Sequence, residues 1–335
     1  MKRQLLIFIA MMLSAVASAD ETVKINGLWY HIYYNQYSKK YVAQVTLGNS
    51  SISSVSGDIV IPEAVDYKGI RYLVTDIESY AFIGSKVTSV VIPNSVTGIG
   101  YKAFTDCKFL TSVTGGNNIL SIGDEAFSGC NSLTSANILS SVKQIGSLAF
   151  GGCRSLTSVT IGNDIYRIGY GAFWNCYNLT FAVVGEGVKF IDSYAFAGCT
   201  GLTDFYCSAT SVPSTDALAF SGTEVGNVTL HVPEASVNAY KAVAPWNGFK
   251  AVVDLTHGIA DVPAKAVLIQ TNGGMITIQG ADDGTQVSVF GADGTQVGSA
   301  ISNNGQATVN TNLQPGSIAV VKIGEKSFKV IISKI

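Results

Sequence analysis

The dipeptide Ala-Phe returns at nearly constant spacing through the middle of the chain. Its phenylalanines are 22, 23, 23, 23, 23 and 24 residues apart, at Phe82, Phe104, Phe127, Phe150, Phe173, Phe196 and Phe220. An isoleucine stands five residues before most of them, and in the central repeats a cysteine stands three residues after. A fixed period in this range is the signature of a solenoid, in which each repeat forms one turn.

Within one repeat, residues 145–168, the sequence predicts a strand and a tight connection. Val159 and Ile161 alternate with polar neighbours, which is the periodicity of a strand. Phe150 and Cys153 are three residues apart, so one helical or 3₁₀ turn would place both side chains on one face. Because a lone turn cannot offset the entropy of fixing its own backbone, the turns must stack. We therefore expect an α/β solenoid of about seven turns.

Five of the six cysteines occupy one column of the repeat and form what we call the cysteine ladder: Cys107, Cys130, Cys153, Cys176 and Cys199. Adjacent turns are close enough for a disulfide, but side chains stacked in one column point in parallel, and five is an odd number. We expect free, buried thiols. Metal binding is not expected, because the ligands would be 23 residues apart with no histidine nearby.

Residues 1–19 have the pattern of a signal peptide. Lys2 and Arg3 precede a short apolar run, and Ala17-Ser18-Ala19 is an A-x-A cleavage motif, so the mature chain is expected to begin at Asp20. No later apolar run is long enough to span a bilayer. Without Lys2 and Arg3 the net charge is about −4, and there is no basic patch, so nucleic acid is not an expected partner. The sequence predicts export, to the cell surface or the medium.

The repeats resemble the BspA-like class of leucine-rich-repeat proteins, which are exported or cell-surface proteins of bacteria of the Bacteroidetes type. The similarity lies in runs such as Ile145-Gly146, Ala149-Phe150, Cys153 and Leu156-Thr157-Ser158-Val159. It extends over residues 22–256, from the entry segment that includes Gly57–Pro62 to the closing segment that includes Trp246 and Phe249. The resemblance implies a right-handed leucine-rich-repeat array with a strand on one side of every turn.

The sequence divides into five parts. Residues 1–19 are the signal peptide, 20–75 an N-terminal β cap, 76–222 the repeats, 223–257 the C-terminal cap of the array, and 258–335 a small all-β, sandwich-like module. In the last part, short alternating strands are separated by turn signals such as Asp283-Gly284. This module resembles the C-terminal sorting modules of the type IX secretion route. Its Gly316-Ser317-Ile318-Ala319 departs from the usual Gly, Val or Ile, then Tyr, so we expect either a sorting module or a spacer that tethers the solenoid.

In each repeat, the strand residues that alternate with the buried ones point outward, and equivalent residues of successive repeats form outward columns. These columns indicate where a partner would bind. Ser and Thr fill most positions, but the pattern changes near the C-terminal end, at Phe181, Val183, Asp204 and Tyr206. Aromatic residues gathered on a rigid sheet are typical of interaction sites. The alternative is that the C-terminal cap or the β module covers these residues.

The chain lacks the common catalytic motifs G-x-S-x-G and H-E-x-x-H, and its three histidines, His31, His231 and His257, are far apart in sequence. No cofactor is expected. We therefore predict an exported, non-enzymatic binding protein of the adhesin type, whose partner is a host matrix protein, another cell-surface protein or a glycan. The alternative is a glycan-capturing or scaffold component of a surface nutrient-uptake system, and a hydrolase is less favoured. The sequence specifies neither the ligand nor the oligomeric state.

Overall fold

A computed structural model describes residues 20–48, 53–138 and 141–255 of the repeat-bearing part. Further along the chain it describes residues 268–272, 275–279, 283–291, 296–303, 306–311, 313, 318–323 and 326–331. The chain divides into two compact units, Met1–His257 and Gly258–Ile335. The predicted signal peptide, residues 1–19, lies outside the described residues.

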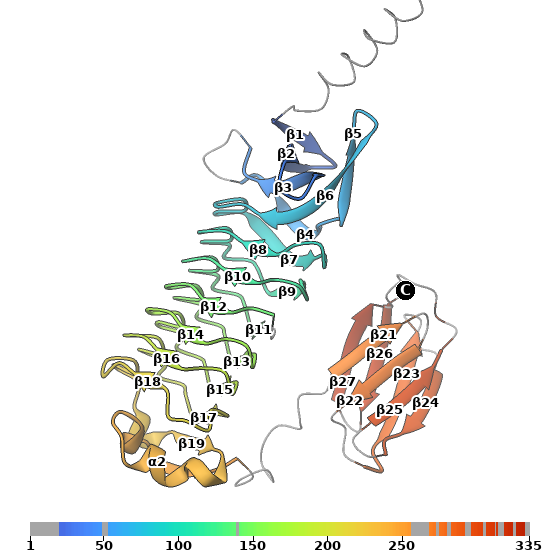
Figure 1. Ribbon diagram of the computed structural model, residues 1–335. Coiled ribbons are helices and arrows are strands. Elements are labelled where there is room, and N and C mark those ends of the chain that lie inside the picture. The colour runs from blue at the N-terminus through green and yellow to red at the C-terminus, as the bar shows by residue number, and fades with distance from the viewer. Residues whose placement is uncertain are drawn as a thin grey trace, which may run out of the picture. The chain divides into compact units, whose positions relative to one another are not determined.

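The first unit begins with antiparallel strands, as the sequence predicts (Figure 1). They are β1 (Glu21–Ile25), β2 (Leu28–Asn35), β3 (Lys40–Thr46), β5 (Ala64–Tyr67) and β6 (Ile70–Ile77). Along β2 the apolar side chains of Leu28, Tyr30 and Ile32 are buried and alternate with less buried neighbours. This alternation gives the sheet one apolar face. Strand β3 pairs in parallel with β6, which joins these strands to the array.

Each turn of the array contributes to two sides of the solenoid (Figure 1). The short-strand side continues from β6 through β8 (Gly98–Ile99), β10 (Ser121–Ile122), β12 (Gln144–Ile145), β14 (Arg167–Ile168), β16 (Phe190–Ile191) and β18 (Ser214–Thr215). The long-strand side begins with a sheet of β4 (Ser56–Val60), β7 (Lys86–Ile92) and β9 (Ser112–Gly115). It continues with β11 (Ser135–Ile138), β13 (Ser158–Ile161), β15 (Phe181–Val184), β17 (Asp204–Cys207), β19 (Thr229–Val232) and β20 (Ala251–Asp254). All strand pairs within these two sides are parallel.

The Ala-Phe segments are hydrogen-bonded turns. Cys107 N donates to Phe104 O at 3.1 Å within one turn, and Phe104 N donates to Ala126 O at 2.7 Å in the next turn. The same two bonds recur along the array, so strands and turns alike are tied to their successors. The array is a β-solenoid of about eight turns with repeats of about 23 residues, which confirms the predicted solenoid. Its connections are tight turns where short helical segments were expected.

The phenylalanines of the repeat form one continuous stack in the core. Neighbouring ring centroids are 4.9 to 5.7 Å apart, and the ring planes differ by no more than 13°. This separation is close to the roughly 5 Å between hydrogen-bonded strands, so the backbone ladder sets the ring spacing. Trp246, on the 3₁₀ helix η3 (Trp246–Gly248), contacts the last ring, Phe220, at 5.7 Å between centroids and closes the stack.

The cysteine ladder lies beside this stack. All six cysteines of the chain are buried and free. Each thiol of the ladder donates to the carbonyl of the phenylalanine one turn earlier, as Cys153 does to Phe127 O at 3.2 Å. At the C-terminal end of the same column, the hydroxyl of Thr223 donates to Phe196 O at 2.7 Å. The column therefore needs a small hydrogen-bond donor, which cysteine supplies along with apolar volume.

The C-terminal cap consists of η1 (Val225–Asn227), η2 (Glu234–Ser236), α2 (Val237–Lys241), η3, β19 and β20. The short helix α2 lies within the segment 223–257 that the sequence assigns to this cap. Its Tyr240 is buried and donates its hydroxyl hydrogen to Ala209 O at 2.8 Å. Phe249 and Trp246 are also buried, as expected for residues that cover the last turn.

The second unit contains two small antiparallel sheets. One sheet has β21 (Leu268–Asn272), β22 (Met275–Gln279) and β25 (Gln306–Asn310). The other has β23 (Gln286–Gly291), β24 (Gln296–Ile301), β26 (Ile318–Ile323) and β27 (Lys326–Ile331). Strand β24 gives only a weak strand signal in the sequence, because Gly298-Ser299 interrupts its apolar alternation. Residues 315–317 of the sorting-module comparison lie outside the described residues. None of the helices in the described part of the chain combines the length and the apolar character that crossing a membrane requires.

The buried thiols lead to a testable prediction. Burial raises the pKa of the Cys153 and Cys199 thiols to about 12, so both remain protonated and unreactive near neutral pH. We expect the native, unreduced protein to react very slowly with a thiol-reactive dye at about pH 8. In denaturant without reductant, the dye should count six thiols per chain. A lower count in denaturant would reveal disulfides and contradict the free ladder.

Candidate functional site

The threonines of the long-strand side are a structural column. The hydroxyl of Thr157 donates to Thr134 O, that of Thr180 to Thr157 O and that of Thr203 to Thr180 O, each at 3.0 Å. These hydroxyls are engaged with the backbone of the preceding turn. The neighbouring outward columns, in which the residue type changes, are therefore better candidates for contact with a partner.

The four candidate residues lie together on two neighbouring strands, and we call them the outward cluster: Phe181, Val183, Asp204 and Tyr206. Phe181 stands opposite Asp204, and Val183 stands opposite Tyr206. The rings of Phe181 and Tyr206 meet across the diagonal, with centroids 5.1 Å apart and planes 52° apart. All four side chains are half-buried. They therefore form a partly exposed apolar surface with one carboxylate at its edge.

The next strand adds a residue that the sequence did not assign to this surface. His231, on β19, stacks on Tyr206 with centroids 4.0 Å apart and planes 2° apart. Its Nε2 lies 3.0 Å from Asp204 Oδ1. His231 is only 3% exposed. From the neighbouring strand β19, the histidine thus holds both the phenol ring and the carboxylate in place.

Within the described part of the chain, the other ring nitrogen of His231, Nδ1, has no hydrogen-bond partner. Because a carboxylate only accepts, Nε2 carries the hydrogen of the bond between His231 and Asp204. Burial, and then the charge of Asp204, raise the pKa of Tyr206. The phenol therefore stays protonated at neutral pH and can donate a hydrogen bond to a partner.

The position of His231 explains why it was missed. The Ala-Phe period defines the columns and ends at Phe220, whereas His231 belongs to the cap that follows. The register Tyr206↔His231 shows that β19 continues the same outward column. The run Thr229-Leu230-His231-Val232, with Leu230 inward, was the available signal.

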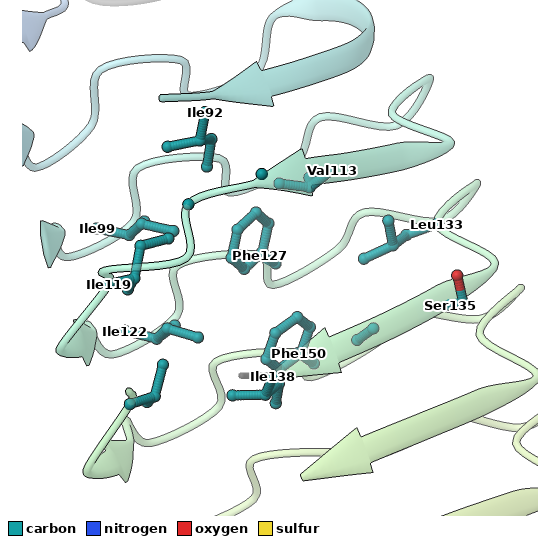
Figure 2. Close-up of a pocket in the computed structure, with 14 residues that line it drawn as sticks. Ile92, Ile99, Val113, Ile119, Ile122, Phe127, Leu133, Ser135, Ile138 and Phe150 are labelled. Carbon is teal, nitrogen blue, oxygen red and sulfur yellow. The ribbon is translucent and has the colours of Figure 1, made fainter. Parts of the chain in front are cut away.

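An apolar cavity of about 70 Å³ lies inside the array, between β9 and β11 (Figure 2). Figure 2 shows the rings of Phe127 and Phe150 between Ile99 on one side and Leu133 on the other. Gly115 lines the cavity at the position that Ile92 and Ile138 occupy 23 residues before and after it. The cavity is far below the roughly 300 Å³ of a small-molecule site. It is a packing defect.

Gly115 also interrupts the long-strand side. Its φ of 82° ends β9, and a Cβ at this position would lie 2.1 Å from Ile92 O. Strands β9 and β11 consequently belong to separate sheets. The backbone bond from Thr134 N to Thr111 O is 3.5 Å long, against 2.9 Å for the bond from Thr157 N to Thr134 O one turn later.

Among all residues that the structure describes, no group of three or more His, Cys, Asp or Glu side chains is placed to hold a metal ion.

Comparison with protein families gives one match. A family model described as the BspA type leucine-rich repeat region matches residues 75–203 and 122–240, in six copies. No curated protein matches this chain.

Solved structures of bacterial leucine-rich-repeat proteins are similar to this chain. The T. pallidum protein TpLRR is 25% identical, with a TM-score of 0.50, over 58% of this chain and 86% of that protein. A Bacteroides ovatus protein is 24% identical, with a TM-score of 0.52, over 64% of this chain and 56% of that protein. A Bacteroides capillosus protein is 30% identical over 41% of this chain and 96% of that protein, with a TM-score of 0.36. The first two share the solenoid fold.

The cavity predicts the effect of two matched substitutions. Ala136 lines the cavity in a column where Val113 and Val159 stand on either side, so Ala136→Val should fill part of the space. We expect it to raise the free energy of unfolding by about 1 kcal/mol. Ala182 lies in the same column but is fully buried against Phe205, so Ala182→Val should instead lower it by about 1–3 kcal/mol. Chemical denaturation measures both. Equal effects of the same sign would contradict the assigned cavity.

Proposed function

Because this chain belongs, through residues 75–240, to the BspA-type leucine-rich-repeat family, we propose that it is an exported binding protein of the adhesin type. It presents the outward cluster to a protein ligand and performs no chemistry on it. A matrix protein of the host or a protein on another cell surface is the partner that this function requires.

The observation that carries the proposal is the fixed arrangement of the outward cluster. Phe181, Tyr206 and His231 are packed ring on ring, and Asp204 is bonded to His231. Parallel strand pairing holds all of them on both sides. Side chains that are already ordered lose little entropy on binding, so most of the contact energy is available for affinity. Tyrosine in such a setting is a frequent hot spot.

The chemistry of the outward cluster favours a particular kind of contact. Phe181 and Val183 offer apolar area, and the side chain of Asp204 remains 38% exposed at its edge. The Tyr206 hydroxyl adds a donor. A partner segment that places an apolar side chain beside a Lys, Arg or backbone N–H would match this pattern.

One further feature supports binding without catalysis, and another supports export. His231 and Asp204 resemble part of a catalytic triad, but His231 is 3% exposed and, in the described part of the chain, its Nδ1 meets no hydroxyl or thiol. A buried histidine without a nucleophile positions Tyr206.

The sequence of residues 1–19 supports export. It has a positively charged start, an apolar run and the motif Ala17-Ser18-Ala19.

The binding proposal is tested with the mature chain from Asp20 and a panel of immobilised extracellular-matrix and cell-surface proteins. We expect saturable binding to at least one of them. The double variant Phe181→Ser, Tyr206→Ser should weaken that binding by more than about tenfold, because it removes both rings.

The control for this test is the double variant Ser158→Ala, Thr160→Ser, which changes the equivalent positions on β13. It should bind like the parent protein. Circular dichroism and thermal unfolding of both variants check the fold. Parent-like affinity of the Phe181 and Tyr206 variant, or binding to glycans without any protein partner, would refute the proposal.

A further inference from the structure

A second surface arises on the short-strand side, where a glycine column ends. The residue after the strand isoleucine is Gly100, Gly123, Gly146 and Gly169 in successive turns. A Cβ at Gly169 would lie 2.6 Å from Ile145 O, so these turns stack too closely for a side chain. In the next two turns the column carries Asp192 and Asp216. The glycine column therefore gives way to carboxylates in these two turns.

At this level the structure has an open cleft of about 440 Å³, which we call the aromatic cleft. Its lining residues lie on or next to three strands, β14, β16 and β18. Figure 1 shows these strands at successive levels of the solenoid. The residues that matter for the chemistry of the cleft are Arg167, Tyr170, Phe190, Asp192, Ser214 and Asp216. Its volume is within the range of about 300–1,000 Å³ that is typical of small-ligand sites.

Aromatic rings in fixed orientations border the cleft. Tyr170 and Phe190, which line the cleft, are 47% and 40% exposed, and Tyr166, which contacts Phe190, is 46% exposed, so each presents much of its ring to solvent. Tyr166 and Phe190 meet edge to face at 5.8 Å, and Tyr170 and Tyr194 do so at 5.6 Å. Each pair joins two adjacent turns, so the rings support one another.

The polar groups of the cleft are also held in place. Arg167 Nε donates to Asp192 Oδ2 at 2.9 Å, and its guanidinium lies 5.7 Å from the Phe190 ring centroid. Asp216 Oδ1 accepts from Leu218 N at 2.8 Å. Ser214 adds a hydroxyl, and the hydroxyl of Thr215 donates to Pro213 O at 3.0 Å. The cleft therefore offers carboxylate acceptors, guanidinium donors and hydroxyls at defined positions.

This combination selects among ligand classes. Two carboxylates against one guanidinium give the lining a negative charge, which disfavours an anionic ligand. The polar lining disfavours an apolar peptide side chain. A neutral sugar matches both parts, because the C–H face of a pyranose ring packs on an aromatic ring while its neighbouring hydroxyls bond to carboxylates and arginine. We propose that the aromatic cleft is a binding site for a neutral oligosaccharide.

This site is independent of the outward cluster. The two surfaces lie on different sides of the solenoid, in different sheets. One can therefore bind in the absence of the other, and each variant should affect only its own ligand.

The test is affinity electrophoresis of the mature chain in gels that contain a neutral soluble polysaccharide, with a panel of such polysaccharides and acidic ones in parallel. We expect at least one neutral polysaccharide to retard the protein. Tyr170→Ala with Phe190→Ala should weaken retardation by more than about tenfold, and Asp216→Asn should weaken it several-fold without loss of the fold.

A matched control exists at the other end of the array. Tyr80 and Tyr101 also form an exposed edge-to-face pair, with centroids 5.3 Å apart, but do not line the cleft. Tyr80→Ala with Tyr101→Ala, and Phe181→Ser with Tyr206→Ser, should leave retardation unchanged. Retardation by acidic polysaccharides alone, by none of the panel, or equal loss in the Tyr80 and Tyr101 variant would overturn the proposal.

Discussion

Backbone hydrogen bonds between equivalent residues of successive turns hold the array together. Phe104 N donates to Ala126 O, and Phe127 N donates to Ala149 O, both at 2.7 Å. Bonds of this kind fix adjacent turns about 5 Å apart. At that spacing the phenylalanine rings stack in contact, and a thiol reaches the carbonyl of the turn before it. The core is a consequence of the backbone ladder, and any residue that widens the spacing disturbs every column at that level.

The same constraint explains where surfaces for partners arise. In a column of identical residues, each side chain can bond to the turn next to it. The threonine hydroxyls, for example, donate to the carbonyls of the preceding turns. Where the residue type changes, some side chains no longer take part in these contacts between turns and are available to a partner. The outward cluster begins where Phe181 follows Ser158, and the aromatic cleft begins where Asp192 follows Gly169. Both changes occur in the same C-terminal turns, on different sides of the solenoid.

The period of the sequence was enough to predict the solenoid, because the apolar residues recur in register and leave few ways to bury them. Other features depend on distances that a period does not contain. His231 lies beyond the last Ala-Phe repeat, so only the strand register joins it to Tyr206. The aromatic cleft depends on how residues of three successive strands, β14, β16 and β18, come together in space. Strand β24 has too little apolar alternation to be recognised from the sequence, and its pairing with β23 is visible only in the structure.

The interruption at Gly115 has a consequence for how the array unfolds. In a linear array, cooperativity passes only through the contacts between neighbouring turns. Between β9 and β11 one of these contacts is weakened, while the pairing of β10 with β12 continues. The boundary is therefore the place where the cooperative unit is easiest to divide. Amide hydrogens of the turns before and after it can then exchange with solvent as two blocks with separate opening free energies.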